Sequence, residues 1–153
     1  HKARVTVVAV TVPAAAARRA APARKSEPIA PLLASADAAA GNKIARKCVG
    51  CHTLKKDSAA KIGPNLWNIV GAAKARSAGF GYSSAMRSKG GTWTYEDLSA
   101  FLEGPRAYLK GTKMAFAGVK KARDRANLIA FLRSLSASPA PLPRAVPGRR
   151  GSP

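Results

Sequence analysis

Apolar residues recur at helical spacing near the C-terminal end of the chain. Four of them stand at positions i, i+3, i+4 and i+7: Leu128, Phe131, Leu132 and Leu135. Residues at these intervals share one side of an α-helix. The pattern therefore predicts an amphipathic helix with a buried stripe, and we expect it to begin near Asp124.

A second helix is predicted to begin at Thr94 and to stop at the Gly104-Pro105 pair. The Thr94 hydroxyl can cap its first turn, with Asp97 three residues later as a shortened capping-box partner. The apolar face of this helix comprises Leu98, Phe101 and Leu102.

A third helix is expected earlier in the chain, where Ser35 can cap a helix that starts near Asp37 and runs toward Cys48. A shorter helical turn is expected over Asn65 to Val70. The segments between are rich in Gly, Ser and Lys and lack the two-residue alternation of strands. The predicted fold class is all-α with long irregular loops, and such loops are unusual in a compact domain unless something, for example a cofactor, packs against them.

Composition divides the chain into three parts. Residues 1–34 are mostly Ala, Pro, Arg and Val without an amphipathic period, which predicts a disordered basic arm or linker. Residues 137–153 form a Pro-rich basic tail, leaving 35–136 as the folded domain. The apolar run at 5–12 fits a chance valine run or the short apolar part of a signal peptide, and no stretch reaches the roughly 20 apolar residues that span a bilayer.

The charge balance is strongly positive. Lys and Arg number 27 against 7 acidic residues, a formal net charge of +20, and the excess belongs to the central domain as well as to the ends. Such a chain attracts nucleic acid, an anionic membrane surface or an acidic protein. The arms lack interleaved aromatic residues for base stacking, which argues against nucleic acid.

One motif carries chemistry, the run Cys48-Val49-Gly50-Cys51-His52. C-x-x-C-H is the attachment signature of c-type haem. Two thiols three residues apart on one helical turn can form thioethers to neighbouring vinyl groups of one porphyrin, and the next residue can place an imidazole on the iron. A thioredoxin-type disulfide would need βαβ units, and none are visible around the motif. A zinc site would need about four ligands, and the chain has no other Cys. The third alternative is a chance pair of buried thiols without a cofactor.

The sixth iron ligand has two candidates. His1 lies in the basic arm, so a second histidine ligand is not expected. The His/Met pair of cytochromes c leaves Met114, in the loop between the two C-terminal helices, and Met86, in a short helix or turn. The loop position favours Met114, because a loop can wrap to the far face of the haem.

The segment at 27–34 and the Pro-rich tail after Leu135 resemble the membrane-anchored bacterial type of class I cytochromes c, and six further stretches resemble the mitochondrial and alphaproteobacterial branch of that family. They follow the family's order and spacing: KCVGCHTLK at 47–55, GPNLW at 63–67, GFGYSSAM at 79–86, TWTYEDLSAFLEGP at 92–105, GTKMAFAGVKK at 111–121 and RANLIAFL at 125–132. The resemblance implies three main helices with short helices and long loops around one haem. It also implies that Gly41, Leu128 and Phe131 form the crossing of the first and last helices.

The resemblance further implies roles for individual residues. Met114 matches the axial methionine, and the Pro64 carbonyl would accept the N–H of His52. Haem contacts are implied for Tyr82, Trp93 and Thr112 at the propionates and for Phe116 near the exposed edge. The positions that ring that edge for partner docking are Lys47, Lys61, Arg106, Lys113, Lys120 and Lys121.

Four departures from the family pattern stand out. Ala72 replaces an arginine that partners a propionate, and Phe101 replaces a tyrosine near the methionine. Lys110 replaces the proline before the GTKM loop, and Ile44 and Ala45 occupy the region of an expected aromatic residue. These changes are expected to affect the reduction potential of the haem, the strength of the bond between Met114 and the iron, and the overall stability of the protein. They leave the assignment of haem attachment intact.

The function implied by the resemblance is single-electron transfer by a monomeric monohaem protein, not enzymatic catalysis. Expected partners are acidic surfaces of a bc1-type reductase and of a terminal oxidase or photosynthetic reaction centre, with an anionic membrane surface as a further candidate. The expected location is the bacterial periplasm, or alternatively the mitochondrial intermembrane space. Two other functions remain open: a peroxidase-like or gas-binding protein with a weak Met114 bond, and a polyanion-binding protein that acts through its basic arms.

Overall fold

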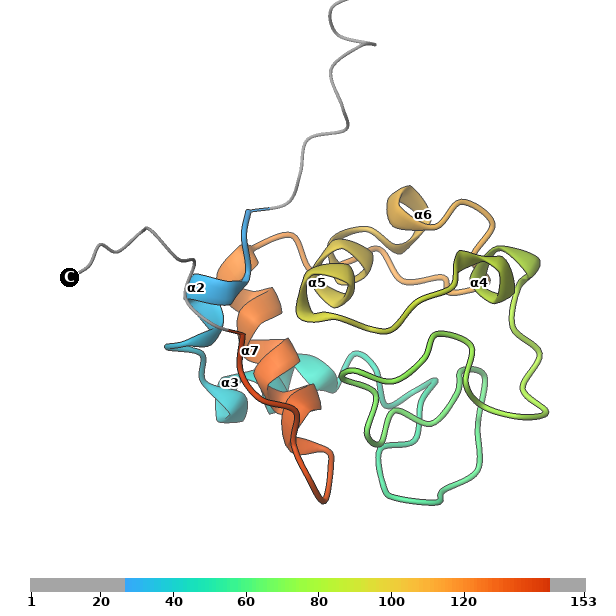
Figure 1. The fold of residues 1–153 in the computed structure, drawn as a ribbon, viewed down its shortest axis with the longest axis horizontal. Coiled ribbons are helices and arrows are strands. Elements are labelled where there is room, and N and C mark those ends of the chain that lie inside the picture. The colour runs from blue at the N-terminus through green and yellow to red at the C-terminus, as the bar shows by residue number, and fades with distance from the viewer. Residues whose placement is uncertain (1–26, 144–153) are drawn as a thin grey trace, which may run out of the picture.

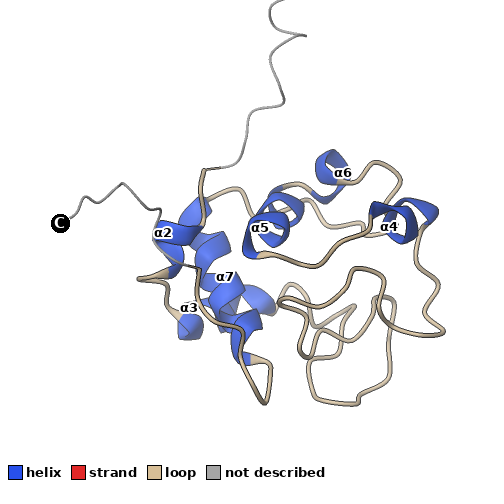
Figure 2. Cartoon of the chain, viewed as in Figure 1, coloured by secondary structure: helices blue, strands red, loops and turns tan. Residues whose placement is uncertain are grey.

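The computed structural model describes residues 27–143, and the described chain is helical on one side and irregular on the other (Figure 1). Its helices are α2 (Ala30–Leu33), α3 (Ala38–Ala45), α4 (Ser84–Lys89), α5 (Tyr95–Glu103), α6 (Pro105–Tyr108) and α7 (Ala122–Ser134). No strand occurs in this part of the chain (Figure 2). The all-α prediction with long loops is confirmed.

The predicted helices form with small shifts at their ends. Thr94 caps α5 by accepting the backbone N–H of Asp97 at 3.0 Å, as predicted. The α7 helix begins at Ala122, two residues before the predicted start. The prediction that Ser35 caps α3 is wrong, because the carboxylate of Asp37 accepts the N–H groups of Ala39 and Ala40.

The closest helix crossing joins α3 to α7, and Gly41 makes it possible. A Cβ at Gly41 would lie 1.8 Å from the carbonyl oxygen of Asn127 and 2.9 Å from Cβ of Phe131. Leu128, Ile129 and Leu132 on α7 are buried in the core beneath this crossing and against α5. The implied helix crossing at Gly41 and Phe131 is therefore present, and Leu128, next to Asn127 on α7, is buried in the core.

The α2 helix corrects the predicted domain boundary. It lies within the range predicted to be a disordered arm, yet Ile29 is 0% and Leu33 is 3% exposed. The N–H of Ile29 donates to a carboxylate oxygen of Glu96 at 3.0 Å, and Arg123 donates to the hydroxyl of Ser35. Residues 29–34 therefore belong to the domain, whereas the rest of the predicted arm, 1–26, lies outside the described residues.

The beginning of the predicted tail is also attached to the domain. The Tyr95 hydroxyl donates to the carbonyl of Pro141 at 2.8 Å, and Arg133 donates to the carbonyl of Ala140 at 2.6 Å. Both ends of the described chain therefore lie over α7 and α5, on the helical side (Figure 1). Residues 144–153 of the predicted tail lie outside the described part.

The helical turn predicted for Asn65 to Val70 does not form. This stretch contains turns and irregular residues, and Asn68 has a φ of 62°, in the left-handed region that interrupts an α-helix. Asn68 also donates its N–H to the carbonyl of Leu135 rather than within a helix. None of the helices in residues 27–143 is long and apolar enough to cross a bilayer.

Candidate functional site

The C-x-x-C-H motif continues the end of α3 as one further helical turn. Cys48 N–H donates to the carbonyl of Ala45, and both Cys51 and His52 donate to the carbonyl of Cys48, at 3.0 and 2.9 Å. The two thiols are free and partly or fully exposed. Cys48, Cys51 and His52 therefore lie on one turn, which is the arrangement that two thioethers and an axial imidazole require.

The ring of His52 is held from behind by the 63–64 segment. Its Nδ1 lies 2.6 Å from the carbonyl oxygen of Pro64. Because a carbonyl only accepts, Nδ1 carries the proton and Nε2 keeps its lone pair for a metal. Gly63 allows this approach, since a Cβ there would lie 2.4 Å from Cε1 of His52.

Burial shifts the pKa values of two motif residues in the free side chains. Burial lowers the pKa of His52, although the hydrogen bond to Pro64 acts in the opposite direction. The neutral imidazole, which is the ligand form, is thus favoured. Burial, followed by the neighbouring Cys51, raises the pKa of the Cys48 thiol, while Lys47 opposes the shift.

Two aromatic residues implied at the propionates present unused donors. Trp93 is 5% exposed, and its indole N–H donates to no acceptor within residues 27–143. The Tyr82 hydroxyl accepts the N–H of Ser77 at 2.9 Å, and its own proton has no acceptor in that range. A buried indole N–H without an acceptor is costly, so a cofactor carboxylate would satisfy a need that the described protein leaves open.

The two methionine candidates lie on neighbouring segments. Met114 is in the irregular segment between α6 and α7, as predicted, and Met86 is on α4. Both are half-buried against the same apolar cluster. The Met114 segment is fixed to the α4 side by Lys113, whose amine donates to the carbonyl of Gly81 at 2.9 Å. Thr112 orients the loop locally, because its hydroxyl oxygen accepts the N–H of Met114 at 3.3 Å.

The structure brings three predicted surface residues together. Phe116, Arg106 and Lys120 line one hollow of about 350 Å³. A second hollow of about 600 Å³ lies between the 58–61 and 77–81 segments and includes Lys61 and Phe80. All six predicted docking residues, Lys47, Lys61, Arg106, Lys113, Lys120 and Lys121, are exposed.

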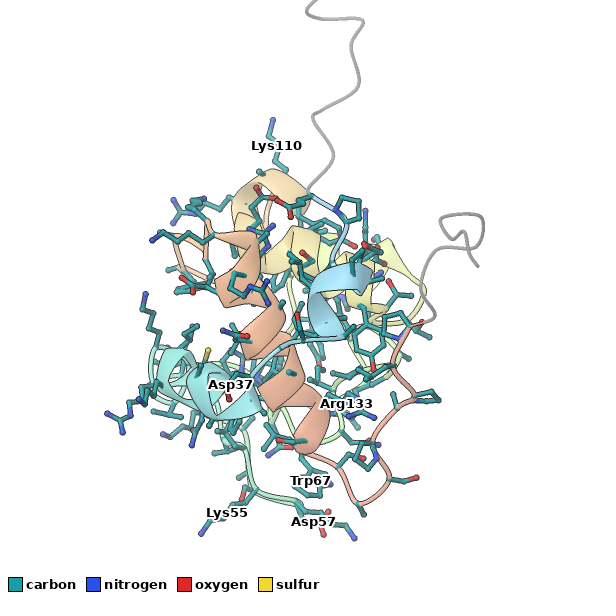
Figure 3. The ribbon with its side chains drawn as sticks, turned by 90° about the vertical axis from the view of Figure 1, so that its left-hand side faces the viewer. Asp37, Lys55, Asp57, Trp67, Lys110 and Arg133 are labelled. Carbon is teal, nitrogen blue, oxygen red and sulfur yellow. The ribbon has the colours of Figure 1, made fainter. Side chains whose placement is uncertain are left out.

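The departures from the family pattern are visible as well. Lys110, one of these departures, points away from the protein (Figure 3). It lies at the opposite end of the molecule from the labelled loop residues Lys55, Asp57 and Trp67. Phe101 is buried in an aromatic group with Trp93 and Tyr108, at ring-centroid distances of 5.1 and 5.8 Å.

Known proteins share this combination of motif and fold. Residues 38–136 match the family model described as Cytochrome c, which covers more than half of the chain. The chain belongs to the cytochrome c family. This membership implies a covalently attached haem c, for which Cys48 and Cys51 have the required spacing.

Curated members of the family match over most of the domain. A "Cytochrome c homolog" from Bradyrhizobium diazoefficiens is 47% identical over 121 residues, which cover 78% of this chain and 66% of that protein. A "Cytochrome c homolog" from Rickettsia prowazekii is 47% identical over 112 residues, which cover 73% of this chain and 64% of that protein. The chain thus spans just under two thirds of the length of these relatives.

A solved structure supports the fold assignment. Cytochrome cH from Methylobacterium extorquens superposes with a TM-score of 0.59 at 35% identity, covering 64% of this chain and 98% of that protein. The predicted class I cytochrome c fold is confirmed.

The residues present fit a haem on physical grounds. Between Cys48 and Thr92, Ile69 is the one buried hydrophobic residue in the described structure. A segment of that length needs an apolar partner to remain packed, and a porphyrin between the His52 and Met114 segments would supply it. The zinc alternative gains no support, since no group of three His, Cys, Asp or Glu side chains gathers within residues 27–143.

Sequence reasoning missed several residues that build the site. Asn65 donates its side-chain amide to the carbonyls of Thr53 and Lys55, at 3.3 and 2.8 Å, and so connects the motif loop to the Pro64 segment. Gly63 and Asn65 belong to the GPNLW stretch, whose Gly-Pro-Asn composition was the available signal. Two further side chains anchor the loops: Lys74 donates to the carboxylate of Asp97, and Arg76 donates to the carbonyl of Asn68. No local signal predicted these contacts, because the partners are not neighbours in sequence.

Proposed function

We propose that this protein is a monohaem c-type cytochrome that carries single electrons between a bc1-type reductase and an oxidase or photosynthetic reaction centre. The observation that carries the proposal is the single turn Cys48 to His52 with the His52 Nδ1 hydrogen-bonded to Pro64. The proposed location is the bacterial periplasm.

Each site residue has a distinct proposed part. Cys48 and Cys51 would hold the haem through thioethers, and His52 and Met114 would bind the iron from opposite faces. When bound, the haem supplies an iron that gains or loses one electron. Because His52 and Met114 come from two anchored segments, both would stay in place when the haem gains or loses an electron, and little rearrangement of the protein would be needed. With His52 and Met114 both bound to the iron, no position would be left for a substrate, and an enzymatic activity is not proposed.

The exposed basic residues beside the motif and around Phe116 would guide partner docking. Lys61 donates from its amine to the carbonyl of Val49, and Lys120 to the carbonyl of Glu103, so both charges are fixed close to the site. Ammonium groups keep further N–H donors and their full charge for acidic partner residues. The resulting attraction raises association rates and weakens as salt increases.

An optical spectrum tests this function. The protein is produced in a host that attaches c-type haem, and spectra are recorded oxidised, reduced, and reduced under carbon monoxide. We expect a low-spin c-type spectrum, the far-red ferric band of methionine ligation, and no response to carbon monoxide. Loss of that band in Met114→Ala but not in Met86→Ala would identify the ligand. A wild type that binds carbon monoxide would favour the ligand-binding or peroxidase-like alternative.

A further inference from the structure

A half-buried arginine, Arg76, lies in the loop side of the molecule with no acidic partner. Its Nη1 donates to the carbonyl of Asn68 at 2.9 Å, and its Nη2 donates to the carbonyls of Asn65 and Trp67. No ion pair joins Arg76 to a carboxylate among residues 27–143, where the one pair is between Lys74 and Asp97. The three carbonyl oxygens satisfy donors of the Arg76 guanidinium but carry no full negative charge, so its positive charge remains available to an anion.

The backbone around Arg76 is constrained in an unusual way. Ala75, the residue before it, has a φ of 57°, in the left-handed region that residues with a Cβ rarely adopt. The two neighbours of Ala75 are both anchored: Lys74 reaches Asp97 on α5, and Arg76 reaches the 65–68 carbonyls. Strain of this kind persists where the surrounding contacts fix it, and it is concentrated at functional positions.

Arg76 also lies near one of the two donors that lack an acceptor, the hydroxyl of Tyr82. Its charge interacts favourably with Tyr82, whose hydroxyl is bonded to the N–H of Ser77, the residue next to Arg76. The residue that carries the other donor, Trp93, is fixed to the same loop by its backbone N–H, which donates to the carbonyl of Ala72 at 2.7 Å. An anion that accepted the Tyr82 proton would therefore lie in the positive field of Arg76.

We propose that Arg76 is the positioning residue that supplies the positive charge opposite the carboxylates of the cofactor, in place of the arginine absent at Ala72. This inference rests on the proposed function. The three carbonyl contacts fix the guanidinium, and the charge then acts on the cofactor through space. A nearby cation disfavours the more positive ferric state and favours ionised carboxylates, so Arg76 raises the midpoint potential and keeps that potential insensitive to pH near neutrality.

Two substitutions at Arg76 separate charge from hydrogen bonding, and an exposed arginine serves as control. Arg76→Gln keeps amide donors but removes the charge, whereas Arg76→Lys keeps the charge but loses the forked donor geometry. Arg87→Gln removes an exposed guanidinium that donates to the carbonyl of Tyr82. Midpoint potentials of the haem-loaded proteins are measured by redox titration from pH 5 to 8, together with thermal unfolding.

At a fixed ambient potential, Arg76→Gln should raise the ferric-to-ferrous ratio about three- to tenfold, which is roughly 30–59 mV at 59 mV per tenfold for one electron. Its potential should also acquire a pH dependence. Arg76→Lys should keep that ratio within about twofold while lowering thermal stability, and Arg87→Gln should stay within about 1.5-fold because exposed charges are screened. Equal shifts in Arg76→Gln and Arg87→Gln, or an Arg76→Lys shift as large as that of Arg76→Gln, would overturn the inference. A wild type without a c-type spectrum would overturn the proposed function instead, so the two failures are distinguishable.

Discussion

The helices α3, α5 and α7 meet through apolar faces, whereas the chain from Cys48 to Thr92 is held by polar contacts to backbone carbonyls. On the helical side the core includes Leu98, Leu102, Leu128 and Ile129, all nearly or fully buried. On the loop side the connections are made by His52, Asn65 and Arg76 to distant carbonyl groups. Apolar packing gives the first region its own stability, while the second depends on a few directional bonds and on a cofactor.

The largest expected effect comes from the helix crossing. In Gly41→Ala the new Cβ would meet the Asn127 carbonyl at 1.8 Å, and two packed backbones cannot separate without opening the core. We expect a destabilisation of at least about 3 kcal/mol or failure to fold. Gly50→Ala is the matched control, because nothing lies within 4 Å of its Cβ position; it should change stability by at most about 0.5 kcal/mol. Denaturant unfolding checks both, and equal effects would mean that the crossing is not the tightest contact.

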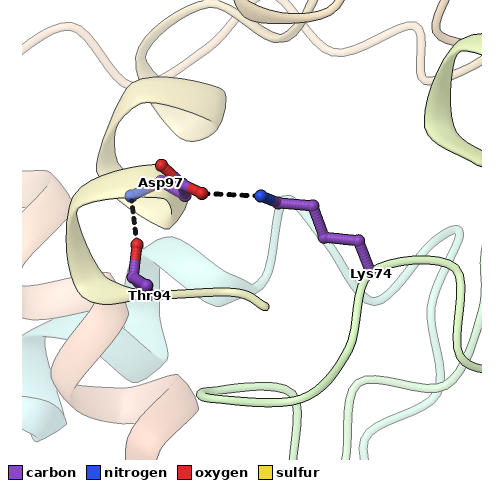
Figure 4. Close-up of polar contacts among 3 residues, drawn as sticks. All are labelled: Lys74, Thr94 and Asp97. Atoms are coloured by element: carbon purple, nitrogen blue, oxygen red, sulfur yellow. Dashed lines mark hydrogen bonds and ion pairs between the residues drawn. The ribbon is translucent and has the colours of Figure 1, made fainter. Parts of the chain in front are cut away.

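A buried ion pair provides the next test, since it fixes the loop side to α5. The Lys74 amine lies 2.6 Å from Asp97, and the two side chains are 3% and 38% exposed (Figure 4). Asp97→Asn leaves a buried ammonium without its partner and should cost about 2–3 kcal/mol. Lys74→Met leaves a carboxylate that water can reach, so it should cost about 1 kcal/mol or less. Chemical denaturation of both variants tests this order, and the reverse order would contradict the burial of Lys74.

The same pair predicts a pH dependence. Burial disfavours the charge of Lys74, but the hydrogen bonds with Asp97 and then with Tyr108 outweigh it, so the pKa of Lys74 is raised above 10.5. A raised lysine pKa gives stabilisation that is complete below about pH 10.5 and is lost as pH rises through the folded-state value. The stability difference between wild type and Lys74→Met should therefore shrink above pH 10.5 and stay constant from pH 6 to 9. A difference that shrinks on acidification within pH 6 to 9 would contradict this assignment.

Hydrogen exchange compares the two regions directly in the haem-loaded protein. Amides at the α3–α7 crossing should exchange at least about tenfold more slowly than amides of residues 74–91, because few buried apolar contacts protect the loops. Mass spectrometry after proteolysis resolves the two groups. Equal protection would show that the polar contacts and the cofactor hold the loops as firmly as the helices hold each other.

The smallest expected effect concerns the C-terminal segment. Tyr95→Phe removes the hydroxyl that donates to the Pro141 carbonyl, and the loss should be about 0.5–1.5 kcal/mol. Tyr108→Phe is a comparison variant that also removes one tyrosine hydroxyl, and it leaves the contact between Tyr95 and Pro141 intact. Susceptibility of the C-terminal segment to proteases should increase in Tyr95→Phe alone. An unchanged cleavage rate would mean that other contacts suffice to hold the segment.

The predictability of the two regions from sequence differs in the same way. The stripe on α7 and the Thr94 cap of α5 are local patterns, so periodicity and capping rules found them. The motif at Cys48 to His52 was found because its chemistry requires a fixed spacing. By contrast, α2 was assigned to a disordered arm, since its helicity follows from the packing of Ile29 and Leu33 against distant helices.

Errors in the loops arose from contacts that no local window contains. Asn65 to Val70 was expected to be helical, but the carbonyls of Asn65 and Asn68 accept from Arg76, and Asn68 adopts a left-handed conformation. Ser35 and Asp37 were both suitable caps for α3, and the sequence offered no reason to choose Asp37 over Ser35. The haem contacts expected in this region follow from the family resemblance, whereas the chain's own anchors at Lys74 and Arg76 required the structure.

The central claim is that Cys48 and Cys51 hold one haem covalently and that this haem completes the loop side. Intact-protein mass spectrometry under denaturing conditions tests it most directly, with protein made in a host that attaches c-type haem. The wild-type mass should exceed the polypeptide mass by one haem, and the double variant Cys48→Ala/Cys51→Ala should show the polypeptide mass alone. A wild-type mass equal to that of the bare polypeptide would contradict the claim.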